Sequence, residues 1–462
     1  MAVSTVAAIR RKLADPLIGM VTGSPKSRYW REVEKTQYLS PEELYRLQWK
    51  RVNEMVQFIY ENNSFYRSRM VKSGMNPQDI KTPDEFSRLP ILTKNDIRDN
   101  IEKIISDGYK STDLKHFKTG GSTGKSLDIM ITEECSEMRN AVARRHDQWA
   151  GWRFGEPVGA VWGNPHIPRT LKEKARHFLL QPTIYLDTME LTGESVKKFA
   201  AEWRKSRPTL LFGHAHSLYL LAQMAETLGI DDIRPRGVIS TSMMLMPHER
   251  AQIERSFDAE VYDRYGCEEV SLIASECERH EGMHLNIEHL YVEFLREDGS
   301  AAKPGESGRV IVTDLINRAM PFVRYQVEDM GVPIDRFCSC GRGLPLMQNV
   351  TGRLADFLIR HDGSRVAGIS LIENTLTKFA GIDQMQIVQE SLDSLVLNVV
   401  PGKGYNRDTQ TLLIGYFNDL FNEKATVELR LIDEIQPEPS GKYRFSICKI
   451  AKSGEKEQLW NM

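Results

Sequence analysis

The segment KTGGSTGKSL at residues 118–127 combines three glycines with hydroxyl residues and two lysines. Glycine accepts positive φ angles and close approach, so the backbone amides of such a segment can turn toward a polyphosphate. Its spacing differs from the G-x-x-x-x-G-K-[ST] pattern of P-loop proteins, because Thr119 stands where the first glycine should be. The segment therefore predicts a phosphate-binding loop of another kind, and the alternative is a plain surface turn.

Cysteine and histidine residues gather in two short windows, SECERHEGMH at 275–284 and CSCGRGLP at 338–345. The candidate ligands are Cys277, His280, His284, Cys338 and Cys340. Three thiols and one imidazole can close a tetrahedral Zn²⁺ site, and a closed site stabilises structure rather than performing catalysis. The alternative is a set of reduced surface thiols.

The composition excludes several classes of protein. The chain of 462 residues has 61 Lys and Arg against 63 Asp and Glu, so no overall positive field favours nucleic acid. No apolar run reaches the roughly 18 residues of a membrane span. The first residues, MAVSTVAAIRRKLADPL, place their charges after a short apolar run, which predicts an amphipathic helix rather than a secretory signal. We expect a cytoplasmic protein, and a homodimer is compatible with the sequence.

The middle of the chain predicts an α/β core. Residues 40–110 are charged and helical, and the helix begins with Ser40 as N-cap and Pro41 at the first helical position. Strand candidates at 157–164, 209–213, 236–242 and 259–266 then alternate with helical or loop segments. Residues 288–315 contain two alternating strands around a Gly/Pro loop, which predicts a smaller β subdomain.

The composition changes after residue 353. Apolar residues recur at helical spacing in 369–379 and again in 413–421, while SLVLNVV and TVELRLI alternate with period two. These patterns predict two helices and about three strands in a small α+β domain. The predicted domains are therefore 1–353 and 354–462.

Five fragments in a fixed order resemble the adenylate-forming ligases, and among these the phenylacetate–CoA ligase branch with its CapK-like members. The fragments are TGGSTGKSL at 119–127, YDRYGCEEV at 262–270, RYQVEDMG at 324–331, VTGRLADFLI at 350–359 and EPSGKYRF at 438–445. The resemblance covers nearly all of the chain. It implies a large N-terminal α/β adenylate-forming domain with a β subdomain, followed by a small mobile C-terminal α+β domain.

By this resemblance, the glycine-rich loop holds the β- and γ-phosphates of ATP. The loop residues are Thr119, Gly120, Gly121, Ser122, Thr123, Gly124 and Lys125.

The resemblance also assigns the nucleotide and Mg²⁺ contacts in the next two motifs. Glu269 takes the place of the Mg²⁺-binding glutamate, and one carboxylate suffices because Mg²⁺ shares its oxygen ligands with substrate phosphates. Glu268 replaces the usual threonine beside it. Tyr265, followed by Gly266, flanks the adenine or the acyl group, and Asp329 binds the ribose hydroxyls with charge-assisted hydrogen bonds.

Two positively charged residues near the predicted domain junction and the C-terminus complete the implied active site. Arg353 contacts ribose or phosphate, and the hinge falls at Ala355 or Asp356. Lys442 follows Pro439-Ser440-Gly441, as the adenylation lysine of the family follows its Pro-x-Gly. Its ammonium would offset the repulsion between the attacking carboxylate and the α-phosphate.

Residues at strand ends of the core form the predicted acid pocket, because ligands of open α/β sheets bind there. They are Trp162, Asn164, His166, Phe212, His214, His216, Ser240 and Ser242. Aromatic, imidazole and hydroxyl groups together favour an aryl or small polar acid over a long acyl chain. For the zinc site, relatives of the phenylacetate–CoA ligases indicate Cys277, His284, Cys338 and Cys340, with His280 as the alternative ligand.

Three hypotheses for the function follow. In the first, ATP, Mg²⁺ and a carboxylic acid give an acyl-adenylate, and coenzyme A captures the acyl group. In the second, the acceptor is an amine or a hydroxyl, such as an amino sugar in polysaccharide assembly. The third is a zinc-stabilised binding protein without catalysis, which the presence of Lys442, Asp329 and Glu269 disfavours.

Overall fold

The computed structural model describes residues 5–14, 17, 19, 23–118, 127–163, 170–171, 173, 177, 182–348, 350, 354–355, 357–379, 381–402, 404–421, 424–435 and 444–450. The chain divides into two compact units. The first comprises Met1–Lys118, Leu127–Phe154 and Tyr262–Thr351, and the second comprises Gly155–Val261 and Gly352–Met462 together with the segment 119–126. Several functional predictions fall outside the described residues, namely Thr119 to Lys125, Asn164, His166, Arg353, Asp356 and Lys442.

The helices of the first unit precede most of its strands. They are α1 (Thr5–Ile9), the π-helix η1 (Arg10–Ala14), α3 (Lys26–Thr36), α4 (Pro41–Asn62), α5 (Ser64–Lys72), α6 (Pro83–Phe86), α7 (Lys94–Asp99) and α8 (Glu133–Trp149), with short 3₁₀ turns η2 (Pro77–Asp79) and η3 (Ser111–Asp113). The predicted start of α4 is confirmed: the Ser40 side chain accepts a hydrogen bond from the Glu43 amide, and Glu43 completes a capping box. Its buried residues Val52 and Ile59 share a hydrophobic core with Val312 of β11 (Gly308–Asp314).

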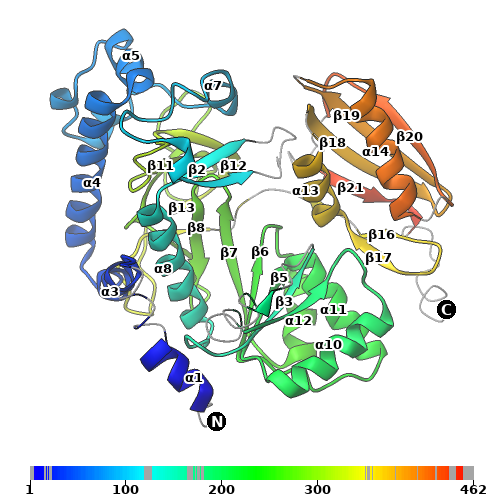
Figure 1. Cartoon of the computed structure of the whole chain (residues 1–462). Coiled ribbons are helices and arrows are strands. Elements are labelled where there is room, and N and C mark those ends of the chain that lie inside the picture. Colours follow the sequence, from blue (N-terminus) through cyan, green and yellow to red (C-terminus); the bar gives the residue numbers. More distant parts are fainter. Residues whose placement is uncertain are drawn as a thin grey trace. The chain divides into compact units, whose positions relative to one another are not determined.

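Three groups of strands complete the first unit (Figure 1). The hairpin of β1 (Lys115–Lys118) and β2 (Asp128–Ile131) flanks the glycine-rich segment. An antiparallel sheet contains β10 (Leu290–Leu295), β11 (Gly308–Asp314) and β12 (Tyr325–Gly331). The third group runs in the order β13 (Pro333–Ile334), β14 (Leu346–Met347), β9 (Met283–Leu285), β8 (Ser271–Glu276) and β7 (Val261–Cys267). The predicted β subdomain is thereby confirmed, with β12 as an additional strand.

In the second unit, residues 155–261 form the parallel part of the α/β core. The strands lie in the order β6 (Gly237–Thr241), β5 (Leu210–His214), β3 (Val158–Trp162) and β4 (Thr183–Asp187), and each neighbouring pair is parallel. The helices are α10 (Gly193–Ser206), α11 (Ala215–Thr227) and α12 (Pro247–Phe257), drawn in green in Figure 1. Val161 and Leu211 of the sheet share a core with Phe199, Leu218 and Ile253 of these helices.

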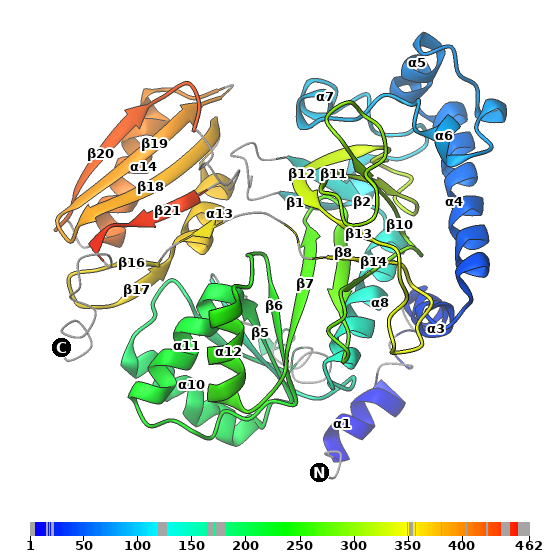
Figure 2. The same ribbon diagram turned by 180° about the vertical axis from the view of Figure 1, so that it is seen from behind.

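The C-terminal residues form a five-stranded sheet with two helices. Its strands are β15 (Leu354–Ala355), β21 (Arg444–Cys448), β18 (Ile382–Ser391), β19 (Ser394–Pro401) and β20 (Thr426–Leu431), in that order, beside a hairpin of β16 (Phe357–Ile359) and β17 (Arg365–Ala367). The helices are α13 (Gly368–Lys378) and α14 (Arg407–Leu420). Figures 1 and 2, which view the sheet from opposite sides, show α14 against one of its faces. The α+β class is confirmed, and the sheet has more strands than the sequence predicts.

Candidate active site and metal cluster

The hairpin of β7 and β8 carries the predicted residues Tyr265, Gly266, Glu268 and Glu269. Its tight turn depends on glycine, because a Cβ at Gly266 would lie 2.6 Å from the carbonyl oxygen of Ser271. The strand pairing shifts register between Tyr265 and Gly266. This irregular turn positions Glu269 inside the unit, where it is 6% exposed, while Glu268 remains at the surface.

Two reciprocal hydrogen bonds join this hairpin to β12. Tyr265 donates its phenol to Asp329 Oδ2 at 3.1 Å, and Tyr325 donates its phenol to Glu269 Oε1 at 2.9 Å. Each element thus contributes one buried tyrosine and one buried carboxylate. The hydrogen bonds fix the orientation of both carboxylates and bring two oxygen-rich groups into one region of the first unit.

Two cationic residues that the sequence analysis did not select support the same turn. Lys94 of α7 is 3% exposed, and its Nζ lies 4.0 Å from Glu269 Oε1. Arg139 of α8 donates to the carbonyl oxygens of Glu268 and Glu269, and pairs with Asp314 at 3.1 Å. The only local signal for Lys94 is its position after Thr93, whose side chain caps α7.

Arg324, which precedes the β12 tyrosine, has a structural role. Its guanidinium pairs with Glu293 at 2.9 and 3.0 Å and donates to the carbonyl oxygens of Ser87 and Leu89. Its φ of 52° is in the left-handed region, where the surrounding contacts must hold a residue with a Cβ. Arg324 therefore holds the start of β12 and, with it, Asp329.

The residues predicted for the acid pocket separate into several environments of the second unit. Trp162 of β3 stacks on Phe212 of β5 with ring centroids 5.2 Å apart, and its ring lies 3.9 Å from that of His214. These three therefore lie together. His214 is fully buried, neither of its ring nitrogens has a hydrogen-bond partner among the described residues, and burial lowers its pKa to about 3. It is a neutral imidazole at physiological pH.

His216 and Ser240, two other residues predicted for the pocket, lie in different surroundings. His216 of α11 contacts Glu249 of α12, with Nδ1 2.7 Å from Oε1. Ser240 pairs in register with Gly213, so it faces the side of the sheet that packs against α11, whereas Thr241 pairs with His214 and shares its face. Thr241 is thus a candidate that the sequence analysis missed. Ser242 follows β6 with a left-handed φ of 66°.

The predicted zinc ligands form one cluster in the first unit. The ligand atoms of Cys277, His284, Cys338 and Cys340 lie within 4.8 Å of one another. The Sγ atoms of Cys277 and Cys338 are 3.6 Å apart, and His284 Nε2 lies 3.4 Å from Cys340 Sγ. His280 is not in this group, and its Nδ1 is 3.2 Å from Glu276 Oε2.

The surroundings of the cluster suit a divalent metal. His284 Nδ1 lies 3.3 Å from the carbonyl oxygen of Leu344, which leaves Nε2 directed toward the thiols. Burial lowers the pKa of His284 to about 4, so the imidazole is neutral, as a metal ligand must be. Burial acts to raise the pKa of Cys340, but hydrogen bonds from Arg342 outweigh it and lower the pKa. A set of three sulfur ligands and one nitrogen ligand fits Zn²⁺.

The region before and after the predicted domain junction is described in part. Ala355, one of the two predicted hinge positions, pairs with Ser446 of β21.

No helix of the described residues is both long and apolar enough to cross a membrane.

Comparison with known proteins finds similarity to CapK and to phenylacetate–coenzyme A ligases, the relatives indicated by the sequence motifs. The CapK C-terminal domain model matches residues 358–449. Protein CapK of Staphylococcus aureus is 23% identical over 436 residues, which cover 91% of this chain and 92% of that protein. Phenylacetate–coenzyme A ligase of Pseudomonas putida is 24% identical over 382 residues, covering 80% and 83% of the two chains.

Among solved structures, 2-hydroxyisobutyryl-CoA ligase in complex with 2-HIB-AMP and CoA superposes with a TM-score of 0.62 at 18% identity, covering 91% of this chain and 93% of that chain. This likeness establishes the adenylate-forming ligase fold, and it confirms the predicted fold class. The chain thus matches the CapK C-terminal domain over residues 358–449, and over most of its length it is similar to CapK and to phenylacetate–coenzyme A ligases.

Proposed function

We propose that the protein is an AMP-forming acid–thiol ligase. In the first step a carboxylate oxygen attacks the α-phosphorus of ATP, which gives an acyl-adenylate and releases pyrophosphate. In the second step the thiol of coenzyme A attacks the acyl carbon, which gives a thioester and releases AMP. The observation that carries the proposal is the reciprocal pairing of Tyr265 with Asp329 and of Tyr325 with Glu269.

The chemistry of these groups supports separate roles in ATP binding. Tyr265 donates a hydrogen bond to Asp329 and orients its carboxylate, a group that can accept hydrogen bonds from the ribose hydroxyls. Glu269 offers a carboxylate to Mg²⁺, with Lys94 beside it to limit the negative charge before the metal binds. The glycine-rich loop at 119–125 would hold the β- and γ-phosphates, with Arg353 at ribose or phosphate, and Lys442 would neutralise the approach of the acid to the α-phosphate.

An aryl or small polar acid is the proposed substrate class. Trp162 and Phe212 offer flat apolar surfaces, and neutral His214 offers a hydrogen-bonding edge without a charge. A long acyl chain would leave the buried imidazole nitrogens of His214 unsatisfied, which costs free energy.

A screen for acid-dependent pyrophosphate release tests the function. Aryl, arylacetic, hydroxy and amino acids are supplied with ATP and Mg²⁺, with and without coenzyme A. We expect one acid class to release pyrophosphate, and AMP release that depends on coenzyme A. AMP release that requires an amine or a hydroxyl acceptor would instead support the second hypothesis. No ATP–pyrophosphate exchange with any acid would contradict the proposed enzyme.

A structural Zn²⁺ bound by Cys277, His284, Cys338 and Cys340 completes the proposal. We expect the purified protein to contain about one zinc per chain by elemental analysis, since a tetrahedral site takes four ligands. His284→Gln should lower the zinc content and the thermal midpoint, whereas His280→Gln, the matched control, should retain the metal. Equal zinc loss in both variants, or wild-type protein without zinc after expression with added zinc, would contradict the site.

A further inference from the structure

A stripe of exposed apolar side chains follows the N-terminal helical segment. Val6, Ile9, Leu13 and Leu17 are 43%, 49%, 57% and 58% exposed. Val6, Ile9 and Leu13 recur every three to four residues within Thr5–Ala14, which places them along one side of this helical segment, and Leu17 is a further exposed leucine after it. Ala7 in the same segment is 1% exposed, so the helix contacts the protein by another face. The remaining exposed large apolar side chains of the described residues are scattered along the chain from Tyr38 to Leu431.

The same part of the chain is strongly basic. Residues 1–31 contain six Lys and Arg against a single acidic residue, although the whole chain has a net charge of −2. Lys12 is exposed on η1 beside the apolar stripe, and Arg28 and Arg31 are exposed on α3. Arg10 is buried and Arg28 pairs with Glu134 at 3.4 Å, so Arg11 and Lys12 carry the positive charge next to the apolar stripe.

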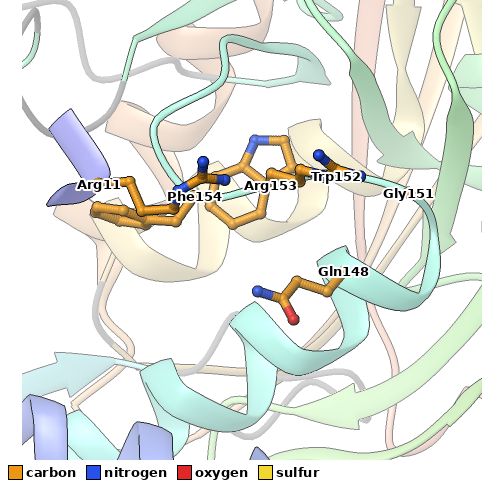
Figure 3. Close-up of a pocket in the computed structure, with 6 residues that line it drawn as sticks. All are labelled: Arg11, Gln148, Gly151, Trp152, Arg153 and Phe154. Carbon is orange, nitrogen blue, oxygen red and sulfur yellow. The ribbon is translucent and has the colours of Figure 1, made fainter. Parts of the chain in front are cut away.

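A cavity of about 400 Å³ links the helix to the end of α8. It is lined by Arg11, Gln148, Gly151, Trp152, Arg153 and Phe154, with no acidic side chain among them. Figure 3 shows Gln148 reaching from α8 below the other labelled side chains. Arg144 lies over the Phe154 ring at 3.8 Å, which adds a further cation to this aromatic region. Arg11 thus belongs both to the basic helix and to a cavity of arginine and aromatic groups.

We propose that this surface, formed by the apolar stripe and the Arg11–Arg153 cavity, binds the protein peripherally to an anionic lipid bilayer. The apolar side chains would enter the boundary between headgroups and acyl chains, as in other interfacial amphipathic helices. The arginines would contact lipid phosphates, and Trp152 is suited to the interface because its ring is apolar with a polar edge.

Charge favours a membrane over a second copy of the chain as the occupant. A symmetric dimer through this surface would bring Arg11, Lys12 and Arg153 of one copy toward the same residues of the other. Like charges at an interface oppose association, whereas an anionic bilayer complements them.

Co-flotation of the full-length protein with lipid vesicles tests the proposal. We expect binding to vesicles of phosphatidylcholine mixed with phosphatidylglycerol, weaker binding to pure phosphatidylcholine, and a decrease at high salt. The double variant Ile9→Asp, Leu13→Asp should bind at least about ten-fold more weakly, because both apolar contacts are lost. Arg153→Gln should weaken binding by about five-fold, the effect of one cation near an anionic surface.

The matched control is Leu412→Asp, which changes an equally exposed leucine on α14 (61% exposed) and should bind like the wild type. Circular dichroism and the thermal midpoint establish that each variant is folded. The absence of binding to anionic vesicles by folded wild-type protein would overturn the proposal. So would equal losses in Leu412→Asp and the double variant, or a dimer in solution that the double variant abolishes while vesicle binding is absent.

Discussion

At the scale of single residues, two tyrosine–carboxylate hydrogen bonds organise the candidate site, with Glu269 as the proposed Mg²⁺ ligand and Asp329 as the proposed ribose contact. Tyr325 holds Glu269, and Tyr265 holds Asp329. All four groups are buried in the first unit, so each tyrosine–carboxylate hydrogen bond has a larger effect than it would in water.

Tyr325→Phe should therefore weaken Mg²⁺-dependent activity. The variant loses the 2.9 Å hydrogen bond that orients Glu269, and a hydrogen bond to a charged group contributes about 1.5 to 3 kcal/mol. We expect roughly a ten-fold or greater increase in the Mg²⁺ concentration for half-maximal pyrophosphate exchange. The control is Tyr60→Phe, which loses an exposed 3.3 Å contact to Asn76. An identical Mg²⁺ dependence in wild type and Tyr325→Phe would count against Glu269 as a metal ligand.

At the scale of elements, the β7–β8 hairpin is the part of the candidate site where we expect a substitution to be most destabilising. The backbone at Gly266 packs closely against the backbone of Ser271 and Leu272 in the neighbouring strand β8. The hairpin also receives support from α7 through Lys94 and from α8 through Arg139. These contacts support the turn in the conformation that presents Glu269.

Gly266→Ala should disrupt this hairpin. The new Cβ would be 2.6 Å from the Ser271 carbonyl oxygen and 2.9 Å from the Leu272 Cα, both backbone atoms that cannot rotate away. We expect a loss of about 1 to 3 kcal/mol in the free energy of unfolding, measured with urea, together with lower activity. Gly415→Ala in α14 has no atom within 4 Å of its new Cβ and should be neutral or stabilising by up to about 1 kcal/mol. If both variants were equally stable, the hairpin backbone would have moved to accommodate the new Cβ, which would contradict this prediction.

The motif around Tyr265, Gly266 and Glu269 could be predicted from the sequence because all its members are adjacent in the chain. Lys94 and Arg139 could not, because they come from helices distant in sequence that fold against the same turn. Strand β18 was missed for another reason. The side chain of Gln389 is fully buried and forms hydrogen bonds with both the backbone N–H and the backbone C=O of Ile359. A polar residue type at a buried position breaks the alternation of apolar and polar residues by which a strand is predicted.

The face of the sheet toward which each side chain points could not be predicted from the sequence either. Ser240 and His214 both follow the strand-end pattern, yet the register of β5 and β6 places them on opposite faces of the sheet. The choice between His280 and His284 likewise depends on the fold, because only His284 belongs to β9, which pairs with β14 close to the cysteine window. The division of the chain at 353 and 354 and the mobility of the C-terminal domain stay predictions.

At the scale of the whole molecule, buried neutral histidines couple stability to pH. Burial lowers the pKa of His214 to about 3 and that of His289 to about 4, and it lowers the pKa of His146 as well. An unfolded histidine has a pKa of about 6.5, so between that value and the folded pKa the unfolded state binds more protons. The contribution of these histidines to folding stability therefore falls as the pH falls below about 6.5.

Unfolding by urea at pH 7 and pH 5 measures this effect. His214 and His289 should each reduce the free energy of unfolding by an amount on the order of 2 kcal/mol over this interval. His289→Gln, which removes one titrating group, should show a shallower pH dependence than the wild type. His248→Gln, which changes a surface histidine of α12, should keep the wild-type slope. Equal stability of the wild type at the two pH values would contradict the account.

The central claim is that the protein joins an acid to AMP before the acyl transfer, with Lys442 acting in the first step alone. The direct measurement compares wild type and Lys442→Ala in two assays, acid-dependent ATP–pyrophosphate exchange and thioester formation from a supplied acyl-adenylate and coenzyme A. We predict that the variant loses exchange by at least about 100-fold, since it lacks the cation that offsets charge in the transition state, while thioester formation remains near the wild-type rate. Equal loss of both reactions, or full exchange in the variant, would contradict the account.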